Sequence, residues 1–317
     1  MLRLLITLAT VFLTWASAAA EQVRVATWNI ANFWHVEGEY LRPEPGGGPG
    51  QIRTAADYRA IADLARELNA DIVGLQEMGS TEAARRAFPE ATYDLIFSRR
   101  FEEDLRADPS KLANPKKRDI YTALALRKDK VKLIRIEPIA ELAITDREGH
   151  PVRDGTAALV EAGGRRFWAV SLHLNSGCAR IEDPASYRNP SRPNLEEACE
   201  MLVRQIPILE RWIDVRERAG EDFVLLGDFN RVFDRANEPL WRDLDDRDPQ
   251  TLDLFMVPYR QALVCSGHSP EPDRSIAYVI LNKRLWAWAE PSDSPKLDVT
   301  GKNVSDHCPV FLDLRLP

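Results

Sequence analysis

The amino-acid sequence predicts an α/β protein in which two packed β-sheets are flanked by helices. Segments typical of strands and helices alternate near both ends of the chain, with hairpin-like segments between them, and this mixture favours a layered sandwich over a purely parallel sheet. The 21 prolines and 16 glycines among 317 residues indicate many turns and argue against a helical bundle. No internal repeat or shift in composition divides the chain, so we expect one domain over residues 21–317.

The first half of the chain contains several predicted strands and one predicted helix. Residues 23–27 alternate between apolar and polar side chains, as a short strand does. Ile61, Leu64 and Leu68 recur at helical spacing and predict an amphipathic helix over residues 55–68. The apolar residues 72–75 then predict a buried strand. Further strands are predicted at residues 93–97, 121–126 and 131–136.

The second half begins with a predicted hairpin, because residues 157–161 and 166–172 flank the pair Gly163-Gly164. A long helix pattern follows over residues 195–218. Pro207 lies inside this pattern, and we expect it to kink the helix or to make it restart there. Late strands are predicted at residues 223–226, 276–281 and 310–314.

Residues 1–20 have the three parts of an export signal. Arg3 supplies a positive start, residues 4–15 are apolar, and Ala18-Ala19-Ala20 supplies the small residues that precede a cleavage site. The apolar run of 12 residues is shorter than the roughly 20 needed to span a membrane. An N-terminal core helix is the alternative interpretation. We expect a protein exported to the periplasm or secreted, without membrane insertion.

The four cysteines all lie after this segment, at Cys178, Cys199, Cys265 and Cys308. An even number in an exported chain suggests two disulfides, for which three connectivities exist. Pairing Cys178 with Cys199 and Cys265 with Cys308 is the simplest choice, and buried free thiols are the alternative. No C-x-x-C pair occurs, so the sequence does not indicate a structural zinc site.

The charge of the chain limits its partners. A formal net charge of −7 argues against a chromatin-type protein that holds nucleic acid over a basic surface. Basic clusters at residues 99–100, 116–118 and 165–166 could contact a phosphate backbone, or they could simply be solvated. DNA or RNA would therefore bind weakly and in a salt-sensitive way. We expect a monomer.

Polar side chains follow the ends of several predicted strands, where α/β scaffolds place their chemistry. Each has an ordinary alternative: Glu77 could cap a helix, residues 227–230 could form a turn, His173 could be a core histidine, and Asp306 could cap a turn. Together, however, carboxylates, imidazoles and amides make a site for a hard cation and a phosphate ester. The group comprises Asn29, Glu77, His173, Asn175, Asp228, Asn230, Asp306 and His307.

At these residues the chain resembles the endonuclease/exonuclease/phosphatase superfamily, which includes deoxyribonuclease I. The resemblance spans Asn29 to His307, and its segments occur in the family's order. It implies a four-layered sandwich and Mg²⁺-dependent hydrolysis of phosphodiesters or phosphomonoesters, with Mn²⁺ or Ca²⁺ as alternative ions. The matching segments are Thr27-Trp28-Asn29-Ile30, Leu75-Gln76-Glu77, Ser171-Leu172-His173, Gly227-Asp228-Phe229-Asn230 and Ser305-Asp306-His307.

The resemblance also implies roles for the metal-side residues. Glu77 would be the principal metal ligand with Asn29 beside it, and Asp306 would be a second carboxylate on the metal side. Mg²⁺ prefers oxygen ligands of this kind, and it lowers the pKa of the water it binds.

Four further residues would act on the water and the phosphate. Asp228 would position or deprotonate the attacking water, and Asn230 would orient that water or the phosphate. His307 would be a base or phosphate ligand. His173 would be an acid or a stabiliser on the leaving-group side, since an imidazole titrates near neutral pH.

Three assignments rest on a looser resemblance. Arg153 is similar to a phosphate-contacting arginine of the deoxyribonuclease branch, although a solvated loop arginine is the alternative. Asn175 is a candidate substrate contact. Asp119 is a candidate for the carboxylate that orients His173.

One position departs from the family. The penultimate strand usually carries an Asp that orients the final histidine, and this chain has Ala277 there. Asp273 and Asp298 are candidate substitutes. We therefore expect a slow enzyme.

The sequence thus favours an exported Mg²⁺-dependent nuclease or phosphodiesterase. The alternatives are a phosphatase acting on a small or lipid phosphate, and a catalytically impaired binding protein that lost the acid at Ala277. Substrate specificity would lie in loops such as residues 36–52 and 99–118.

Overall fold

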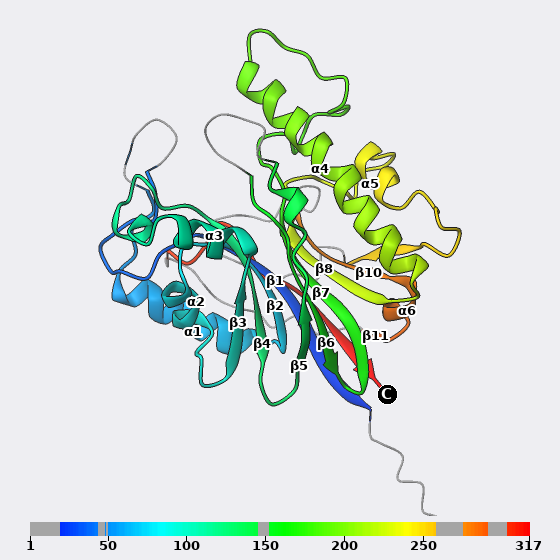
Figure 1. Ribbon diagram of the computed structural model, residues 1–317, viewed down its shortest axis with the longest axis horizontal. Helices are drawn as coiled ribbons and strands as arrows, with labels where there is room; N and C mark the ends of the chain where they lie inside the picture. The colour runs from blue at the N-terminus through cyan, green and yellow to red at the C-terminus, as the bar shows by residue number, and fades with distance from the viewer. Residues whose placement is uncertain (1–19, 44–47, 49, 145–151, 258–274, 291–302) are drawn as a thin grey trace, which may run out of the picture.

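The computed structural model describes residues 20–43, 48, 50–144, 152–257, 275–290 and 303–317. Two six-stranded β-sheets pack face to face in this part of the chain, and helices cover their outer sides (Figure 1). The predicted fold class, two packed mixed sheets flanked by helices, is confirmed.

The first sheet combines strands from both ends of the chain. Its spatial order is β11-β12-β1-β2-β4-β3, with β1 and β2 parallel and the other neighbours antiparallel. In chain order the strands are β1 (Glu21–Phe33), β2 (Ile72–Met78), β3 (Tyr93–Phe97), β4 (Tyr121–Arg127), β11 (Ala289–Glu290) and β12 (Val310–Leu316).

The second sheet comes from the middle of the chain. Its spatial order is β5-β6-β7-β8-β10-β9, with β7 and β8 as its parallel pair. Its strands are β5 (Lys132–Ile136), β6 (Thr156–Ala162), β7 (Arg165–His173), β8 (Asp222–Asp228), β9 (Leu254–Met256) and β10 (Ala277–Asn282).

Helices cover each sheet on its outer side. Those that follow strands of the first sheet are α1 (Ala55–Leu68), α2 (Thr81–Ala87), α3 (Arg99–Ala107) and the 3₁₀ turn η1 (Lys111–Ala113). The remaining helices are η2 (Ala140–Leu142), α4 (Pro193–Arg218), α5 (Pro239–Leu244) and α6 (Lys283–Trp286). Figure 1 shows α1 to α3 beside one sheet and α4 and α5 beside the other.

Apolar side chains fill the spaces between these layers and form three large buried clusters. Val25 and Leu312 of the first sheet meet Phe167 and Leu226 of the second in the central cluster. The outer faces of the two sheets bury their apolar side chains against α1 and α2 on one side and against α4 on the other. Burial of this apolar area is the main stabilising contribution to the sandwich, and it fixes the strand ends that carry the polar residues.

The two long helices test the sequence predictions differently. The structure confirms the helix predicted over residues 55–68, which begins after a capping box made by Thr54 and Asp57 and ends at Asn69 in the left-handed conformation. Of the two effects expected at Pro207, a kink or a restart, the restart does not occur, because α4 continues through this residue. Buried Leu202, Ile206 and Leu209 hold both halves against the second sheet and outweigh the missing backbone N–H.

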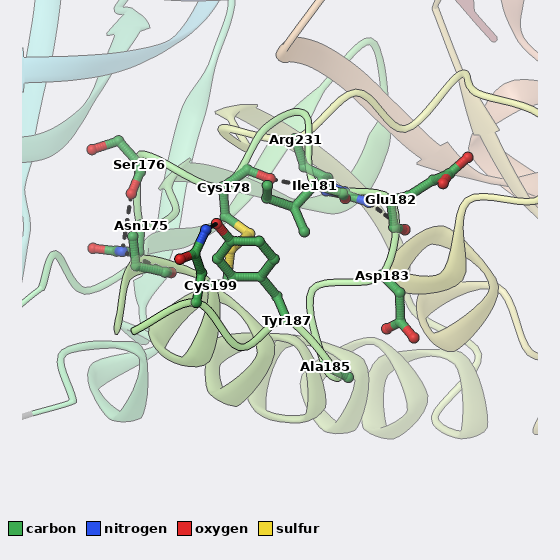
Figure 2. The surroundings of a disulfide bond; sticks show 12 residues. Asn175, Ser176, Cys178, Ile181, Glu182, Asp183, Ala185, Tyr187, Cys199 and Arg231 are labelled. Carbon is green, nitrogen blue, oxygen red and sulfur yellow. Dashed lines mark hydrogen bonds between the residues drawn. A yellow bond between two sulfur atoms is a disulfide. The ribbon is translucent and has the colours of Figure 1, made fainter. Parts of the chain in front are cut away.

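A disulfide joins Cys178, in the loop after β7, to Cys199 in the second turn of α4 (Figure 2). Buried Arg231 supports the same loop, since it donates hydrogen bonds to the carbonyl oxygens of Cys178 and Ile181 and pairs with Glu238. The predicted Cys178–Cys199 pair is thus confirmed. The predicted partner of Cys308, Cys265, lies outside the described residues.

No helix among the described residues is long and apolar enough to cross a membrane. The predicted export signal lies outside them, apart from Ala20.

Candidate active site

Four predicted site residues lie where parallel strands end. In the first sheet, β1 and β2 run parallel with Asn29 beside Gln76, so Asn29 and Glu77 reach the same edge. In the second sheet, β7 and β8 run parallel with His173 directly beside Asp228. The two sheets are packed together, and therefore these four side chains come together at one rim of the sandwich.

The backbone at this rim is unusual. Ala31, Asn32, Glu77 and Asn230 all have positive φ angles between 45° and 61°. Such angles are costly for residues other than glycine and cluster at functional sites, where the surrounding structure maintains them. At Glu77 the strand pairing is also irregular between Leu75 and Met78. In this irregular geometry the Glu77 carboxylate lies against the end of β1, where Asn29 and Asn32 donate to it.

Asn29 connects the two carboxylates of the site. Its side-chain N–H groups donate to Glu77 Oε1 at 3.1 Å and to Asp228 Oδ2 at 3.0 Å. Its amide oxygen accepts the Ala31 N–H at 2.9 Å, which fixes the orientation of the amide. Asn29 is thus a hydrogen-bond donor to both acids in this arrangement, and its role as a metal ligand stays a prediction.

Glu77 receives a second hydrogen bond, from the backbone N–H of Asn32 to its Oε2 at 2.7 Å. Both carboxylate oxygens are therefore held in place by residues of β1. The side chain is 16% exposed, so an ion or water molecule can reach it from the rim.

Both predicted histidines face Asp228. His307 Nε2 lies 3.6 Å from Asp228 Oδ2, and His173 Nε2 lies 3.9 Å from the same oxygen and 3.9 Å from Glu77 Oε1. These separations are longer than hydrogen bonds. His307 Nε2 is also 3.9 Å from Asp306 Oδ1, and the Asp306 side chain is 57% exposed. The site thus holds two imidazoles around one buried carboxylate.

Burial shifts the protonation equilibria of this group. The pKa of Asp228 is raised by burial, and the charge of His307 and the Asn29 hydrogen bond only partly oppose this effect. The pKa of His173 is well below its usual value of 6.5, chiefly because of burial and then because of the positive charges of Arg153 and His307. His173 is therefore neutral at pH 7.

Arg153 and Asn230 meet at one carbonyl group. Arg153 Nη2 donates to Leu174 O at 2.6 Å, and Asn230 Nδ2 donates to the same oxygen at 2.9 Å. Burial lowers the pKa of Arg153 to about 10, which leaves it charged at neutral pH. Its buried Nε has no hydrogen-bond partner in the described part of the chain. The unpaired Nε–H of Arg153 and the nearby His173 together suit the binding of an anion.

Two predicted residues do not join the group. The Asn175 amide donates to the backbone oxygens of Ser176 and Ala198, toward the start of α4. The Asp119 carboxylate pairs with Arg100 of α3 and lies 3.8 Å from Arg42. The structure thus gives His173 no orienting acid at Asp119, and His173 Nδ1 is buried without a hydrogen-bond partner among the residues described.

Three residues that matter here were not predicted from the sequence. Arg42 donates from Nε to Asn32 Oδ1 at 2.9 Å, and its charge lowers the pKa of His173. Gln76 is buried between the sheets, where it accepts from Thr27 and donates to Ser171 at 3.2 Å. Arg53 is buried against the end of β1, where it donates to the carbonyl oxygens of Ile30 and Ala31. A glutamine inside an apolar strand was a usable signal, whereas the two arginines resemble ordinary loop residues.

Ala277 lies opposite Asp228 in the antiparallel pair of β8 and β10. Directly opposed residues project to the same face of a sheet, so an acid at this position would stand beside Asp228. The proposed substitutes Asp273 and Asp298 lie outside the described residues. Within the described part of the chain, the acids that face His307 are Asp228 and Asp306.

The residues of the site fit a hard, hydrated cation. No group of three His, Cys, Asp or Glu side chains among the described residues forms a closed metal site. Mg²⁺ does not require one, since it keeps several water ligands and is commonly bound through one or two carboxylates. Glu77, held by two hydrogen bonds and partly exposed, and the exposed Asp306 supply such carboxylates.

Comparison with known proteins gives a consistent picture. The sequence matches the profile of the Endonuclease/Exonuclease/phosphatase family over residues 26–307. A search of curated proteins finds no significant match.

Several solved structures share the fold. A Bacteroides vulgatus endonuclease/exonuclease/phosphatase has a TM-score of 0.57 and 20% identity over 94% of this chain and 100% of its own. The human nocturnin catalytic domain, with a bound sulfate anion, has a TM-score of 0.55 and 16% identity over 92% and 93%. A Bacteroides thetaiotaomicron mannosyl-6-phosphatase has a TM-score of 0.51 and 15% identity over 92% and 98%.

Proposed function

Since the chain belongs to the endonuclease/exonuclease/phosphatase family, we propose that it hydrolyses phosphodiester bonds with the help of Mg²⁺ through attack of a water molecule. The observation that carries this proposal is the convergence of Asn29, Glu77, Asp228, His173 and His307, from both sheets, on one network of contacts no longer than 3.9 Å.

Two groups support proton transfer. Asp228 is buried with a raised pKa, so its carboxylate accepts a proton more readily than a solvated one does. His307 lies 3.6 Å from it and is 20% exposed, so its ring can reach both Asp228 and a molecule at the rim. Together they would position a water molecule and take its proton.

His173 and Arg153 are suited to contact the phosphate and the leaving group. His173 is neutral at pH 7 and can donate an N–H to an oxygen on which negative charge develops. Arg153 contributes a positive charge close to His173. Its partnerless buried Nε could donate to a phosphoryl oxygen.

Glu77 and Asp306 would hold the metal ion, and Asn29 and Asn32 would keep Glu77 in the required orientation. When bound, Mg²⁺ would supply neutralisation of charge on the phosphoryl oxygens and a lower pKa for bound water.

A small phosphate ester is a second candidate substrate, because acids neutralise most of the basic clusters that could bind a nucleic-acid backbone. Arginines and a lysine from all three clusters are in ion pairs, which reduces the positive charge that these clusters can offer to a polyanion. These pairs are Arg99–Glu103, Arg100–Asp119, Lys117–Asp108, Arg118–Glu39, Arg165–Asp222 and Arg166–Glu161.

A substrate screen tests the proposal. We expect Mg²⁺-stimulated turnover of bis(p-nitrophenyl) phosphate that EDTA abolishes and added Mg²⁺ restores. Faster turnover of p-nitrophenyl phosphate and inositol phosphates than of the diester, plasmid DNA or RNA would favour the second candidate. No turnover of any of these with Mg²⁺, Mn²⁺ or Ca²⁺ would contradict enzymatic activity and favour an impaired binding protein.

We further propose that the protein is exported and acts as a monomer. The Cys178–Cys199 disulfide supports export, because such bonds persist in oxidising compartments. N-terminal sequencing of protein from the periplasm or medium should begin at Glu21, and an intact N-terminus in the cytoplasmic fraction would contradict export. Light scattering should give the mass of one chain.

A further inference from the structure

Arg53 is a buried arginine that lies between two segments of the candidate site. It is 1% exposed and follows directly on the exposed Ile52. Its guanidinium makes five hydrogen bonds, and every acceptor is a backbone carbonyl. The acceptors are Ile30 O at 2.6 Å, Ala31 O at 2.7 Å, Val304 O at 2.9 Å, Asn32 O at 3.3 Å and Asn303 O at 3.3 Å.

This arrangement is unusual because the buried cation has no direct counter-ion. Among the described residues no carboxylate lies within ion-pair distance of Arg53. Burial lowers its pKa to about 10, and the more distant charges of Glu77 and Asp306 favour its charged form. Burying a charge without an ion-pair partner costs free energy. We therefore look for the role of Arg53 in the backbone segments that its hydrogen bonds hold in place. No other side chain offers five donors in one plane.

On one side Arg53 holds the irregular end of β1, residues Ile30–Asn32. Its three acceptors there are consecutive, and two of them, Ala31 and Asn32, have positive φ angles of 48° and 45°. This strained turn directs the Ala31 N–H at Asn29 and the Asn32 N–H at Glu77. The guanidinium thus stabilises the backbone that orients the two residues.

On the other side Arg53 holds the segment that leads into the last part of the site. Asn303 and Val304 directly precede Ser305, whose hydroxyl donates to Asn29 O at 2.6 Å and accepts the His307 N–H at 3.0 Å. Asp306 and His307 follow at once in the chain. The position of this segment relative to Asn29 therefore depends on the same guanidinium.

The backbone at Arg53 is itself anchored. Thr54 and Asp57 form the capping box at the start of α1. Asp57 accepts the Asn303 N–H at 3.0 Å, and Asn303 donates to Ile52 O at 2.8 Å. Arg53 is therefore fixed to a helix that packs on the first sheet.

We propose that Arg53 is a positioning residue that locks the Asn29–Asn32 and Asn303–His307 segments together at the separation in which Glu77, Asp228 and His307 act as one site. The proposal rests on the proposed function for its catalytic meaning. Arg53 itself touches no reacting group, since backbone carbonyls surround it.

The test compares Arg53→Gln and Arg53→Lys with Arg59→Gln and Arg59→Lys, because Arg59 is an exposed arginine of α1 in the same part of the chain. For Arg53→Gln we expect kcat on bis(p-nitrophenyl) phosphate to fall about 100-fold and Mn²⁺ affinity, measured by calorimetry, to fall about tenfold. KM should change less than threefold. Lysine keeps the charge but cannot span five acceptors, so Arg53→Lys should lose about tenfold in kcat.

Hydrogen exchange gives a readout that needs neither metal nor turnover. The peptides containing Asn32 and His307 should both exchange faster in the Arg53 variants and remain unchanged in the Arg59 variants. If wild-type protein shows no turnover, the proposed function fails, while the exchange comparison still decides the role of Arg53.

Three results would overturn the proposal. One is an Arg53→Lys variant with wild-type kcat, because charge alone would then suffice. Another is a lower melting temperature with unchanged kcat and exchange. The third is loss of the folded state in both Arg53 variants, which would assign the residue to the fold alone.

Discussion

The carboxylate of Asp228 lies between two imidazole rings at the end of β8, and four neighbouring residues determine how it behaves. Asn29 donates to it, His307 and His173 face it, and Ala277 lies opposite it on β10. Small changes at any of these positions should alter protonation before they alter the fold.

Ala277→Asp should raise turnover and lower stability. The new carboxylate would lie on the same face of the sheet as Asp228 and near His307, where it would fix the ring and raise the pKa of the imidazole. We expect kcat to rise up to about tenfold. A second buried acid beside Asp228 should cost about 1–3 kcal/mol of unfolding free energy. The measurement is kcat from pH 5.5 to 9 at saturating Mg²⁺, with denaturant unfolding of both proteins. A variant that is no faster at any pH would show that Ala277 is not a lost catalytic support.

His173→Gln should make the protein less sensitive to acid. The folded protein holds His173 with a lowered pKa, so below pH 6.5 the unfolded chain binds a proton that the folded protein does not. Stability linked to His173 is therefore fully present above pH 6.5 and is lost as the pH falls. Between pH 7.5 and 5.5 the wild type should lose more unfolding free energy than the variant, by on the order of 1 kcal/mol.

Urea unfolding at the two pH values measures this difference. His35→Gln is the matched control, because His35 is only half-buried with a lowered pKa and should give a smaller effect. Equal acid sensitivity of wild type and His173→Gln would mean that the folded protein does not lower the pKa of the buried ring.

At the scale of elements, the long loop between β7 and α4 is held in place by a covalent bond and by a buried ion pair. It is closed by Cys178–Cys199 and supported by Arg231, which directly follows Asn230 and donates to Cys178 O (Figure 2). The loop and the end of β8 are therefore tied together at the rim of the site.

Replacing Cys178 and Cys199 by serine should reduce the unfolding free energy by about 3 kcal/mol, because the disulfide closes a loop with a sequence separation of 21. Guanidinium unfolding of the double variant and wild type measures the loss. Mass spectrometry of alkylated, unreduced wild-type protein should find no labelled cysteine. Labelling of Cys178 and Cys199 would contradict the disulfide, and labelling of Cys265 and Cys308 would contradict the second predicted pair.

At the scale of the whole molecule, elements with local sequence signals were predictable, whereas those that depend on tertiary packing were not. Helix α1 was predictable to its ends, because both of its caps are local in sequence. Helix α3 was missed, since its buried residues are only Arg100 and Phe101 and leave no apolar stripe. The behaviour of α4 at Pro207 depended on packing against the second sheet, which local propensity cannot reveal.

The residues of the candidate site divide in the same way into those with a local sequence signal and those without one. Short motifs at strand ends identified Glu77, His173, Asp228 and His307. Parallel strands bring the first three to one edge, and His307 joins them from the segment before the antiparallel strand β12. The role of Arg53 was not visible in the sequence. Its acceptors are backbone carbonyls, including two that lie about 250 positions away, and any residue type supplies a carbonyl.

The account depends most on Glu77, and one comparison tests it directly: hydrolysis of bis(p-nitrophenyl) phosphate by wild type, Glu77→Gln and the exposed control Glu82→Gln over a range of Mg²⁺ concentrations. Glutamine keeps the shape of Glu77 but removes the charge that would hold the ion, so we expect turnover to fall at least about 100-fold with an unchanged circular dichroism spectrum. Glu82→Gln should match the wild type. Mg²⁺-stimulated turnover by Glu77→Gln at the wild-type rate would contradict the proposed site.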